Sequence, residues 1–172
     1  MGLGINVLEN RQMSSFSSLG HLAAHFAEIA LKQHEMEHHA LEKVGKLVEK
    51  RAKAKIGEYQ DEAGPFIAWP ELADFTKEDR LRQGFSENDP LLRTGAMRDS
   101  IGHQVAGSEV HVGSNSDIAV YQELGTSKIP PRSFLGGAAV DETKRIREII
   151  GEEAVASLVG EKVFGGKMKI DV

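Results

Sequence analysis

The sequence has no cysteine, few aromatic residues and no long hydrophobic run, and each absence excludes a class of protein. Without cysteine, the 172-residue chain cannot form disulfides, thiolate metal sites or a cysteine nucleophile. No apolar run approaches the roughly 20 residues that span a bilayer, so we expect no membrane helix. The first residues lack the basic start and apolar core of a signal peptide, and Asn6 stands where a myristoylation signal needs Ser or Thr. We therefore expect a protein made in the cytoplasm that has no membrane partner.

The common catalytic motifs are also missing, with one exception. The chain has no Gly-x-Ser-x-Gly nucleophile elbow and no phosphate-binding loop that ends in Lys-Ser or Lys-Thr. The exception is His34-Glu35-Met36-Glu37-His38, in which two histidines four residues apart could bind zinc while Glu35 polarises a water molecule. Polar neighbours and the position of Glu35, opposite the apolar side of the predicted helix, favour a solvated helix face. A zinc-dependent hydrolase that uses His34, Glu35 and His38 is the alternative.

Residues 14–56 predict one long amphipathic helix, which Gly45 could interrupt. The serines between positions 14 and 18 are candidates for its N-cap. At about 100° per residue, the apolar residues fall in one stripe centred on Phe26. The members of this stripe are Leu19, Leu22, Ala23, Ile29, Ala30, Ala40, Leu41, Val44, Leu47 and Val48. Because the helix is too long for one small core, we expect part of it to serve a partner chain.

Charge is distributed unevenly along the chain. The net charge of −5 disfavours a dedicated nucleic-acid-binding protein. The end of the long helix is nevertheless basic, and the stretch from 58 to 89 is acidic. The basic residues are Lys43, Lys46, Lys50, Arg51, Lys53 and Lys55. We interpret both stretches as solvated surfaces. The alternatives are head-to-tail contact between like subunits, and a nucleic-acid accessory role for residues 43–55.

The remaining chain predicts short elements around a small sheet. Residues 57–90 form a long, mostly irregular loop, which Phe66 and Trp69 are expected to pin to the core. Alternating residues on both sides of Gly107-Ser108 are typical of a β-hairpin. The other expected elements are helices at 73–82, 90–97, 118–124 and 135–159 and an edge strand at 168–172.

These elements indicate a single α+β domain over residues 1–172. A long N-terminal amphipathic helix and a C-terminal helix are expected to pack on a small antiparallel sheet. The domain divides into a helical arm at 1–56, a long loop at 57–90 and an α+β core at 91–172.

Leu91–Ile101 looks like the segment "L-x-x-T-G-x-L-R-x-S-I", and Tyr121–Thr126 looks like the segment "Y-A-x-x-H-x-F-G-T". Both segments belong to the phage virion-morphogenesis, or tail-completion, family of Mu-like and related tailed phages, which the sequence from residue 57 to about 155 resembles. Ile129–Gly136 is similar to "P-P-R-P-F-L-G", with Ser133 in place of a proline. The other similar segments are Val112-Gly113-Ser114-Asn115, at a strand end, and Ala68–Leu72 with Thr76, which is similar to "W-x-x-L-x-x-x-T".

The resemblance implies a structural component of a bacteriophage virion that has no catalytic activity, cofactor or metal. It implies a homo-oligomeric ring, commonly a hexamer, at the head-proximal end of the tail. The neighbours would be the tail tube and the neck or connector proteins, and DNA would pass through the lumen without sequence-specific binding. The protein would be located in the virion tail or neck after assembly in the host cytoplasm. Tail completion, tail termination and head-to-tail joining are the roles this family likeness leaves open.

The candidate subunit interface is the segment around the two adjacent prolines. Pro130-Pro131 predicts a stiff extended arm, whose apolar end would dock on a neighbouring subunit while Arg132 reaches a carboxylate there, such as Glu123. The candidate residues are Glu123, Gly125, Thr126, Pro130, Pro131, Arg132, Phe134 and Leu135. The alternative is that the same residues close the loop onto their own core. Gly136-Gly137, at the predicted start of a helix, indicates close packing, with an anion site as the alternative.

Overall fold

A single long helix, α1 (Leu19–Lys55), is the axis of the molecule. The structure, a computed structural model, describes residues 18–159. α1 begins at Ser18, whose hydroxyl oxygen accepts a hydrogen bond from the His21 amide, so one of the expected serines is the N-cap. At 1.5 Å per residue the helix is about 55 Å long. It continues through Gly45 without a break and ends before Gly57, whose φ is 105°.

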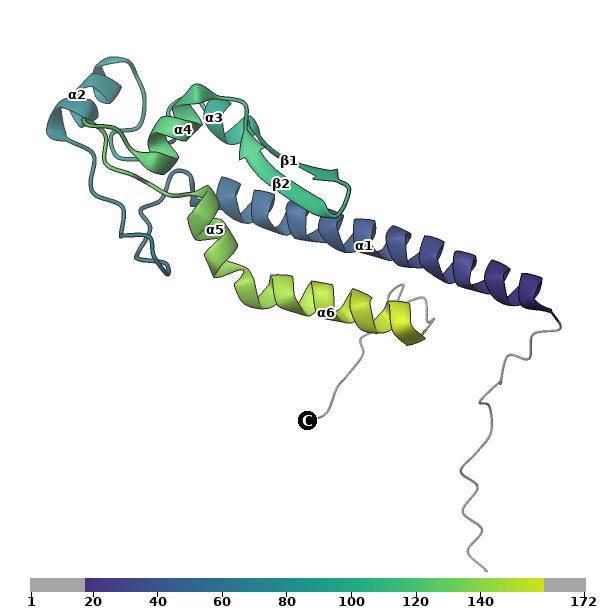
Figure 1. Cartoon of the computed structure of the whole chain (residues 1–172). Coiled ribbons are helices and arrows are strands. Elements are labelled where there is room, and N and C mark those ends of the chain that lie inside the picture. Colours follow the sequence, from purple (N-terminus) through teal and green to yellow (C-terminus); the bar gives the residue numbers. More distant parts are fainter. Residues whose placement is uncertain (1–17, 160–172) are drawn as a thin grey trace, which may run out of the picture.

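The β-hairpin lies along the second half of α1 (Figure 1). Strands β1 (Ile101–Ala106) and β2 (Glu109–Ser114) pair antiparallel, with Val105 opposite Val110 next to the turn. The odd-numbered residues of β1 face the helix, and Ile101 is buried against it. The predicted hairpin is therefore confirmed, and two strands plus helices make the chain α+β.

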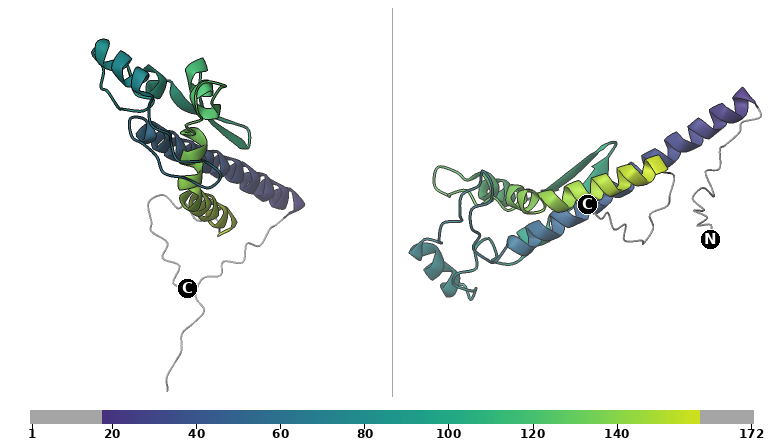
Figure 2. Two further views of the ribbon diagram at one scale, coloured as in Figure 1. Left: turned by 90° about the vertical axis from the view of Figure 1, so that its left-hand side faces the viewer. Right: turned by 90° about the horizontal axis from the view of Figure 1, so that it is seen from below.

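The last part of the described chain forms two helices, not one, and they lie on another side of α1. The predicted helix over 135–159 is divided into α5 (Leu135–Asp141) and α6 (Thr143–Val159). The break lies at Glu142, whose ψ of 6° departs from helical geometry. Next to it, the Thr143 hydroxyl donates to the Ala139 carbonyl, which competes with the helical backbone pattern. α6 then runs antiparallel to α1 (Figures 1 and 2).

The long loop holds α2 (Asp74–Arg82), and α3 (Ala96–Asp99) follows it. The helix expected at 90–97 is replaced by this shorter one, because Leu91 and Gly95 adopt left-handed φ values of 63° and 85°. Trp69 is buried in the hydrophobic core, so the loop is pinned to the core as expected.

One hydrophobic core joins these layers. α4 (Asp117–Leu124), at the end of the molecule opposite the start of α1, contributes only Ala119 to it. The core residues are Ala40, Val44, Val48, Ala52, Ile56, Trp69, Met97, Ile101, Ala119, Phe134, Ala138 and Ile149. Within residues 18–159, no helix is long and apolar enough to cross a membrane. The strand expected at 168–172 lies outside the described residues.

Candidate subunit interface

The segment predicted as an extended arm is folded back against α4. The Gln122 carbonyl accepts a hydrogen bond from the Arg132 amide at 2.7 Å, and the Thr126 amide donates to Ile129 at 2.8 Å. Gly125, with a φ of 74°, lets the two segments approach closely, because a Cβ there would lie 2.8 Å from the Pro131 nitrogen. Residues 125–134 therefore form a brace between α4 and α5.

Glu123 fastens the far end of this brace. Its carboxylate accepts hydrogen bonds from the amides of Phe134 and Leu135, at 2.8 and 2.9 Å, and of Gly136, at 2.9 Å. These amides have no partner inside α5, and a negative charge is favourable at a helix N-terminus. The anion at the start of this helix is thus the chain's own carboxylate. Gly136 serves close packing, since a Cβ there would lie 2.3 Å from the Phe66 ring.

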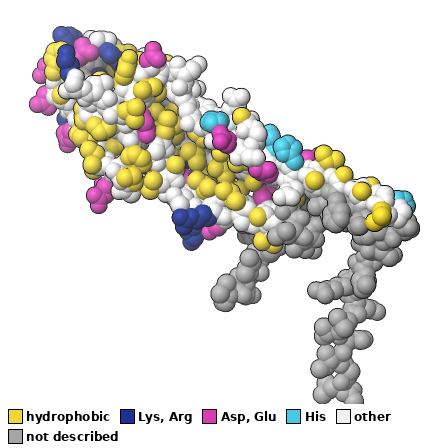
Figure 3. All heavy atoms as spheres, in the orientation of Figure 1, with side chains coloured by type: hydrophobic (Ala, Val, Ile, Leu, Met, Phe, Trp, Pro, Cys, Tyr) yellow, Lys and Arg dark blue, Asp and Glu magenta, His cyan; other side chains and the backbone are white. Residues whose placement is uncertain are grey.

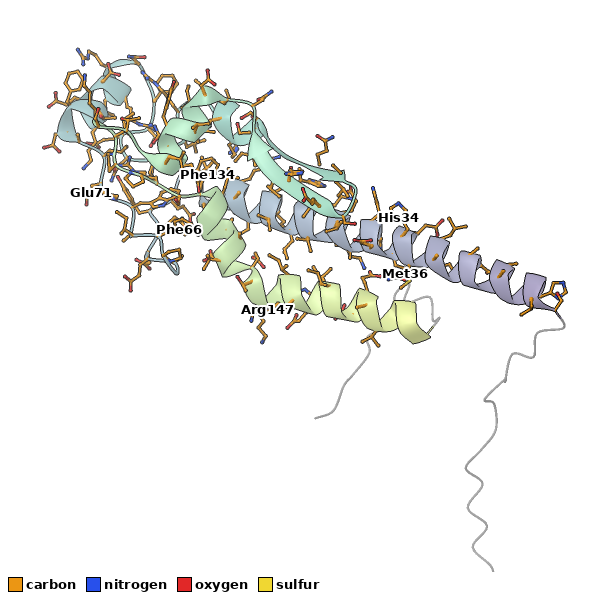
Figure 4. All side chains as sticks on the ribbon, viewed as in Figure 1. His34, Met36, Phe66, Glu71, Phe134 and Arg147 are labelled. Carbon is orange, nitrogen blue, oxygen red and sulfur yellow. The ribbon has the colours of Figure 1, made fainter. Side chains whose placement is uncertain are left out.

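Arg132 is bound inside the chain, and its guanidinium pairs with backbone carbonyls in place of the expected Glu123 carboxylate. Its guanidinium donates to the backbone carbonyls of Pro70, at 2.7 and 3.2 Å, and of Glu71, at 3.2 Å. The residue is only 4% exposed, and this burial lowers the pKa of the guanidinium. Phe134 is completely buried close to Phe66 (Figure 4). Both residues close the loop onto their own core, as the alternative interpretation held, so neither is available to a neighbouring subunit in this fold.

The exposed surface beside the brace is formed by α4. Of the predicted candidates, Thr126, Pro130 and Pro131 are exposed, while Glu123, Gly125 and Leu135 are half-buried. More conspicuous are four exposed apolar side chains, which we call the apolar α4 face: Ile118, Val120, Tyr121 and Leu124, with exposed fractions of 58, 50, 51 and 73%. Figure 3 shows hydrophobic side chains gathered over this end of the molecule.

Sequence reasoning treated α4 only as a short capped helix and missed this face. A signal was present, because the eight residues of α4 include five apolar ones. Apolar side chains that are exposed as a group, and not singly, are typical of an interaction surface. With only Ala119 buried in its own chain, the remaining apolar side chains are left for another surface.

The His34–His38 motif lies on the part of α1 that faces the end of α6. His34, Glu35 and His38 are exposed, and Met36 lies beside a groove against α6 (Figure 4). Within residues 18–159, no three His, Asp or Glu side chains are grouped so that they could hold a metal ion. The geometry therefore shows two histidines on a solvated helix face, without a third ligand from the described residues.

The basic end of α1 is largely neutralised within the chain. Lys43 pairs with Glu153 of α6 at 2.7 Å, while Arg51 and Lys55 both reach Asp141 of α5, at 2.7 and 2.8 Å. Lys46 and Lys53 pair with glutamates one turn earlier on α1. Burial alone would raise the pKa of Asp141, but hydrogen bonds from Lys55 and Arg51 outweigh it and lower that pKa. These contacts hold helices together, and they leave fewer charges for a nucleic acid.

His103 joins the hairpin to α1 and was not recognised from the sequence. Its Nδ1 lies 2.5 Å from Glu49 Oε2, and its Nε2 lies 3.3 Å from Glu42 Oε2. The Glu49 hydrogen bond, supported by Glu42, raises the pKa of the imidazole. The ring sits directly over Gly45, where a Cβ would lie 2.4 Å from its Cδ2. The signal was its position in β1, which shares the inward phase of Ile101 and Val105.

Comparison with known proteins gives no neighbour from which a role could be transferred. No family model, no curated protein and no solved structure matches the chain.

Proposed function

We propose that the chain is a structural component of a bacteriophage virion, a tail-completion or neck protein that assembles into a ring at the head-proximal end of the tail. The observation that carries this proposal is the order of the family-like segments along the chain, from Trp69 through Thr94-Gly95 and Gly125-Thr126 to Phe134. In this role the protein has no catalytic activity and contacts the tail tube and the connector.

The places of these segments in the fold support the proposal. Gly95 has the left-handed conformation that starts α3, and Gly125 makes the close approach to Pro131. Arg132 fastens the long loop through Pro70, and Phe134 is at the centre of the core. The segments that resemble the family thus supply the turns, the brace and the core anchor of one packed unit. If the chain has the same fold as that family, these are the residues that we expect the two to have in common.

The surface of the molecule is also suited to a ring. The first part of α1 extends past the hairpin and past α6, and the apolar α4 face lies at the other end (Figure 1). A subunit with two different exposed apolar surfaces can form the head-to-tail contacts that close a ring. The net charge of −5 suits a wall along which DNA slides, because positive walls would hold the phosphates.

The proposal is tested in particles of the phage whose genome encodes this chain. We expect mass spectrometry to find the protein in purified virions, and an epitope tag at its C-terminus to be labelled at the junction of head and tail. Deletion of the gene should leave DNA-filled heads separate from tails, and plasmid-borne wild-type protein should restore infectious particles. Overlong tails in the deletion would indicate a terminator, and tails of normal length would indicate completion or joining. Normal infectious particles from the deletion would refute a virion role.

A further inference from the structure

A groove with a volume of about 300 Å³ lies between α1 and α6, and we call it the α1–α6 groove. Most of the side chains that line it are apolar. Ala40 is buried there, whereas Ile150 is 49% exposed and Ala154 is also exposed, so the α6 side of the groove is open. The lining residues are Gln33, Met36, Glu37, Ala40 and Leu41 of α1 and Ile150, Glu153 and Ala154 of α6.

Two carboxylates stand beside these apolar side chains, and only one of them is neutralised. Glu153 pairs with Lys43 at 2.7 Å and with His39 at 3.3 Å. Glu37 is exposed, and no cation within residues 18–159 pairs with it. The groove therefore combines apolar walls with one unpaired negative charge, which suits a segment that carries apolar residues next to a cation.

The sequence directly after α6 has this combination. Lys162 is followed by two apolar residues, Val163 and Phe164. Gly160 occupies the first position past the last helical residue of α6. Glycine is the preferred residue at this position, because it adopts the left-handed conformation with which many helices end and the chain changes direction.

The groove is within reach of this segment. At 1.5 Å per residue, Ile150 lies about 14 Å along the helix axis from Val159, where α6 ends. At about 3.3 Å per residue, an extended chain from Val159 to Phe164 covers about 16 Å. A chain that reverses at Gly160 can therefore bring Phe164 back to the level of Ile150.

We infer that the segment 160–164 folds back at Gly160 and places Val163 and Phe164 in the α1–α6 groove of the same chain, with Lys162 beside Glu37. The segment then holds the last turns of α6 against α1, beyond the ion pairs of Glu153. This contact belongs to the fold of one chain, so it does not depend on the virion role.

Thiol cross-linking tests the contact directly, because the chain contains no cysteine. Glu37→Cys places a thiol at the groove, and Lys162→Cys places one next to the two apolar residues. The matched control combines Lys162→Cys with Glu35→Cys, because Glu35 is also an exposed glutamate of α1 but lies about 160° around the helix from Glu37. Exposed positions tolerate such changes, so both full-length proteins should keep their fold.

Each double variant is prepared in isotope-labelled and unlabelled form, and the two forms are mixed, refolded together and treated with a short bismaleimide. Mass spectrometry of the digested protein then measures the rate of cross-linking and shows whether the joined peptides carry the same label. We expect the Glu37→Cys, Lys162→Cys protein to react about tenfold faster than the control, with both peptides from one chain. Adding Phe164→Ser should lower this rate about tenfold, because it removes the apolar anchor.

Equal rates for the two double variants would show that the segment is not seated in the groove and would overturn the inference. A rate that Phe164→Ser leaves unchanged would overturn it too. Cross-links that join a labelled to an unlabelled peptide would assign the groove to a second copy, which also contradicts a contact within one chain.

Discussion

The two halves of α1 have the same sequence periodicity and opposite environments. From Ala40 to Lys55 the apolar stripe is covered by the hairpin on one flank and by α5 and α6 on another. In the projecting half, from 19 to 31, every side chain that the structure describes is exposed, whereas Gln33 and Met36 already line a groove against α6. The covered half is also fastened by charge, through Glu153 and Asp141, whereas the projecting half extends past both contacts.

This difference teaches that helical periodicity predicts which side of a helix is apolar, and not which surface covers it. In the covered half, the rest of the same chain buries the stripe. In the projecting half, the described side chains of residues 19–31 are exposed although the sequence pattern is the same. Substitutions that are identical in chemistry but placed in different halves should therefore differ in effect.

The largest contrast is expected for glutamate in place of alanine in each half. Ala52 is completely buried, so Ala52→Glu places an unpaired carboxylate in the core, which should destabilise the fold by about 4 kcal/mol or more. Ala30 is exposed, so Ala30→Glu should change the free energy of unfolding by less than about 0.5 kcal/mol. Urea denaturation followed by circular dichroism, at a concentration where the protein is monomeric, measures both.

The two alanine variants are each other's control, since the residue types and the helix are the same. Ala30→Glu should instead impair assembly, which sedimentation of concentrated protein would detect. Equal destabilisation by both substitutions would contradict the division of α1 into a covered and a projecting half.

A smaller contrast concerns two glycines in helices. At Gly45 a Cβ would collide with His103 and Val110, at 2.4 and 2.9 Å. We expect Gly45→Ala to destabilise the protein by about 1 kcal/mol, because an overpacking cost of about 1–3 kcal/mol exceeds the gain of about 1 kcal/mol in helix propensity. At Gly151 of α6 no atom lies within 4 Å, so Gly151→Ala should stabilise by about 0.5–1 kcal/mol. Thermal melts of the two variants should shift in opposite directions, and a stabilised Gly45→Ala protein would refute the close contact.

Much of the fold was predictable because its signals are local. The stripe around Phe26 gave the long helix, Gly107-Ser108 gave the hairpin turn, and Gly125 gave the end of α4. The break at Glu142 was not predictable, because the apolar pattern of 135–159 continues across it. The bend follows from how α5 packs on α1. Local periodicity carries no information on such a change of direction.

The candidate site was harder to predict because its contacts join distant residues. Pro130-Pro131 indicated an extended segment, but whether it points outward depends on Glu123 and Gly125, which hold it against α4. Arg132 was expected to meet a carboxylate, and its partners are backbone carbonyls at Pro70 and Glu71, some sixty residues away. Every residue has a backbone carbonyl, so the sequence does not show which carbonyl accepts a hydrogen bond from an arginine. The apolar composition of α4, by contrast, is visible in the sequence, although only the structure shows that four of its apolar side chains are exposed.

The smallest expected effect is a pH dependence of the contact that holds the hairpin on the covered half. Hydrogen bonding to Glu49 and Glu42 raises the pKa of His103 above its ordinary 6.5, so the stabilisation is complete below pH 6.5 and is lost as the pH rises through the folded-state pKa.

The two glutamates act in the opposite direction. The pKa of Glu49, lowered by Lys53 and His103, and that of Glu42, lowered by His103, lie below 4.5. Their contribution to the stability of the fold is therefore present above pH 4.5 and is lost as the pH falls through their lowered pKa values. Lys46 and Lys53 pair with the same two carboxylates, Glu42 and Glu49 respectively.

The hairpin contact should thus be strongest between about pH 4.5 and 6.5. Because the groups are partly solvated, we expect a loss of only about 1 kcal/mol between pH 6 and 9. His103→Gln, which keeps a polar side chain without a titrating ring, should remove this slope, and it should also reduce the loss at acid pH because His103 helps to lower the pKa values of Glu42 and Glu49. Thermal melts of both proteins across this range measure the difference. If the two profiles stay parallel from pH 6 to 9, the charged His103 contact does not hold the hairpin, and packing around Ile101 and Val110 alone must do so.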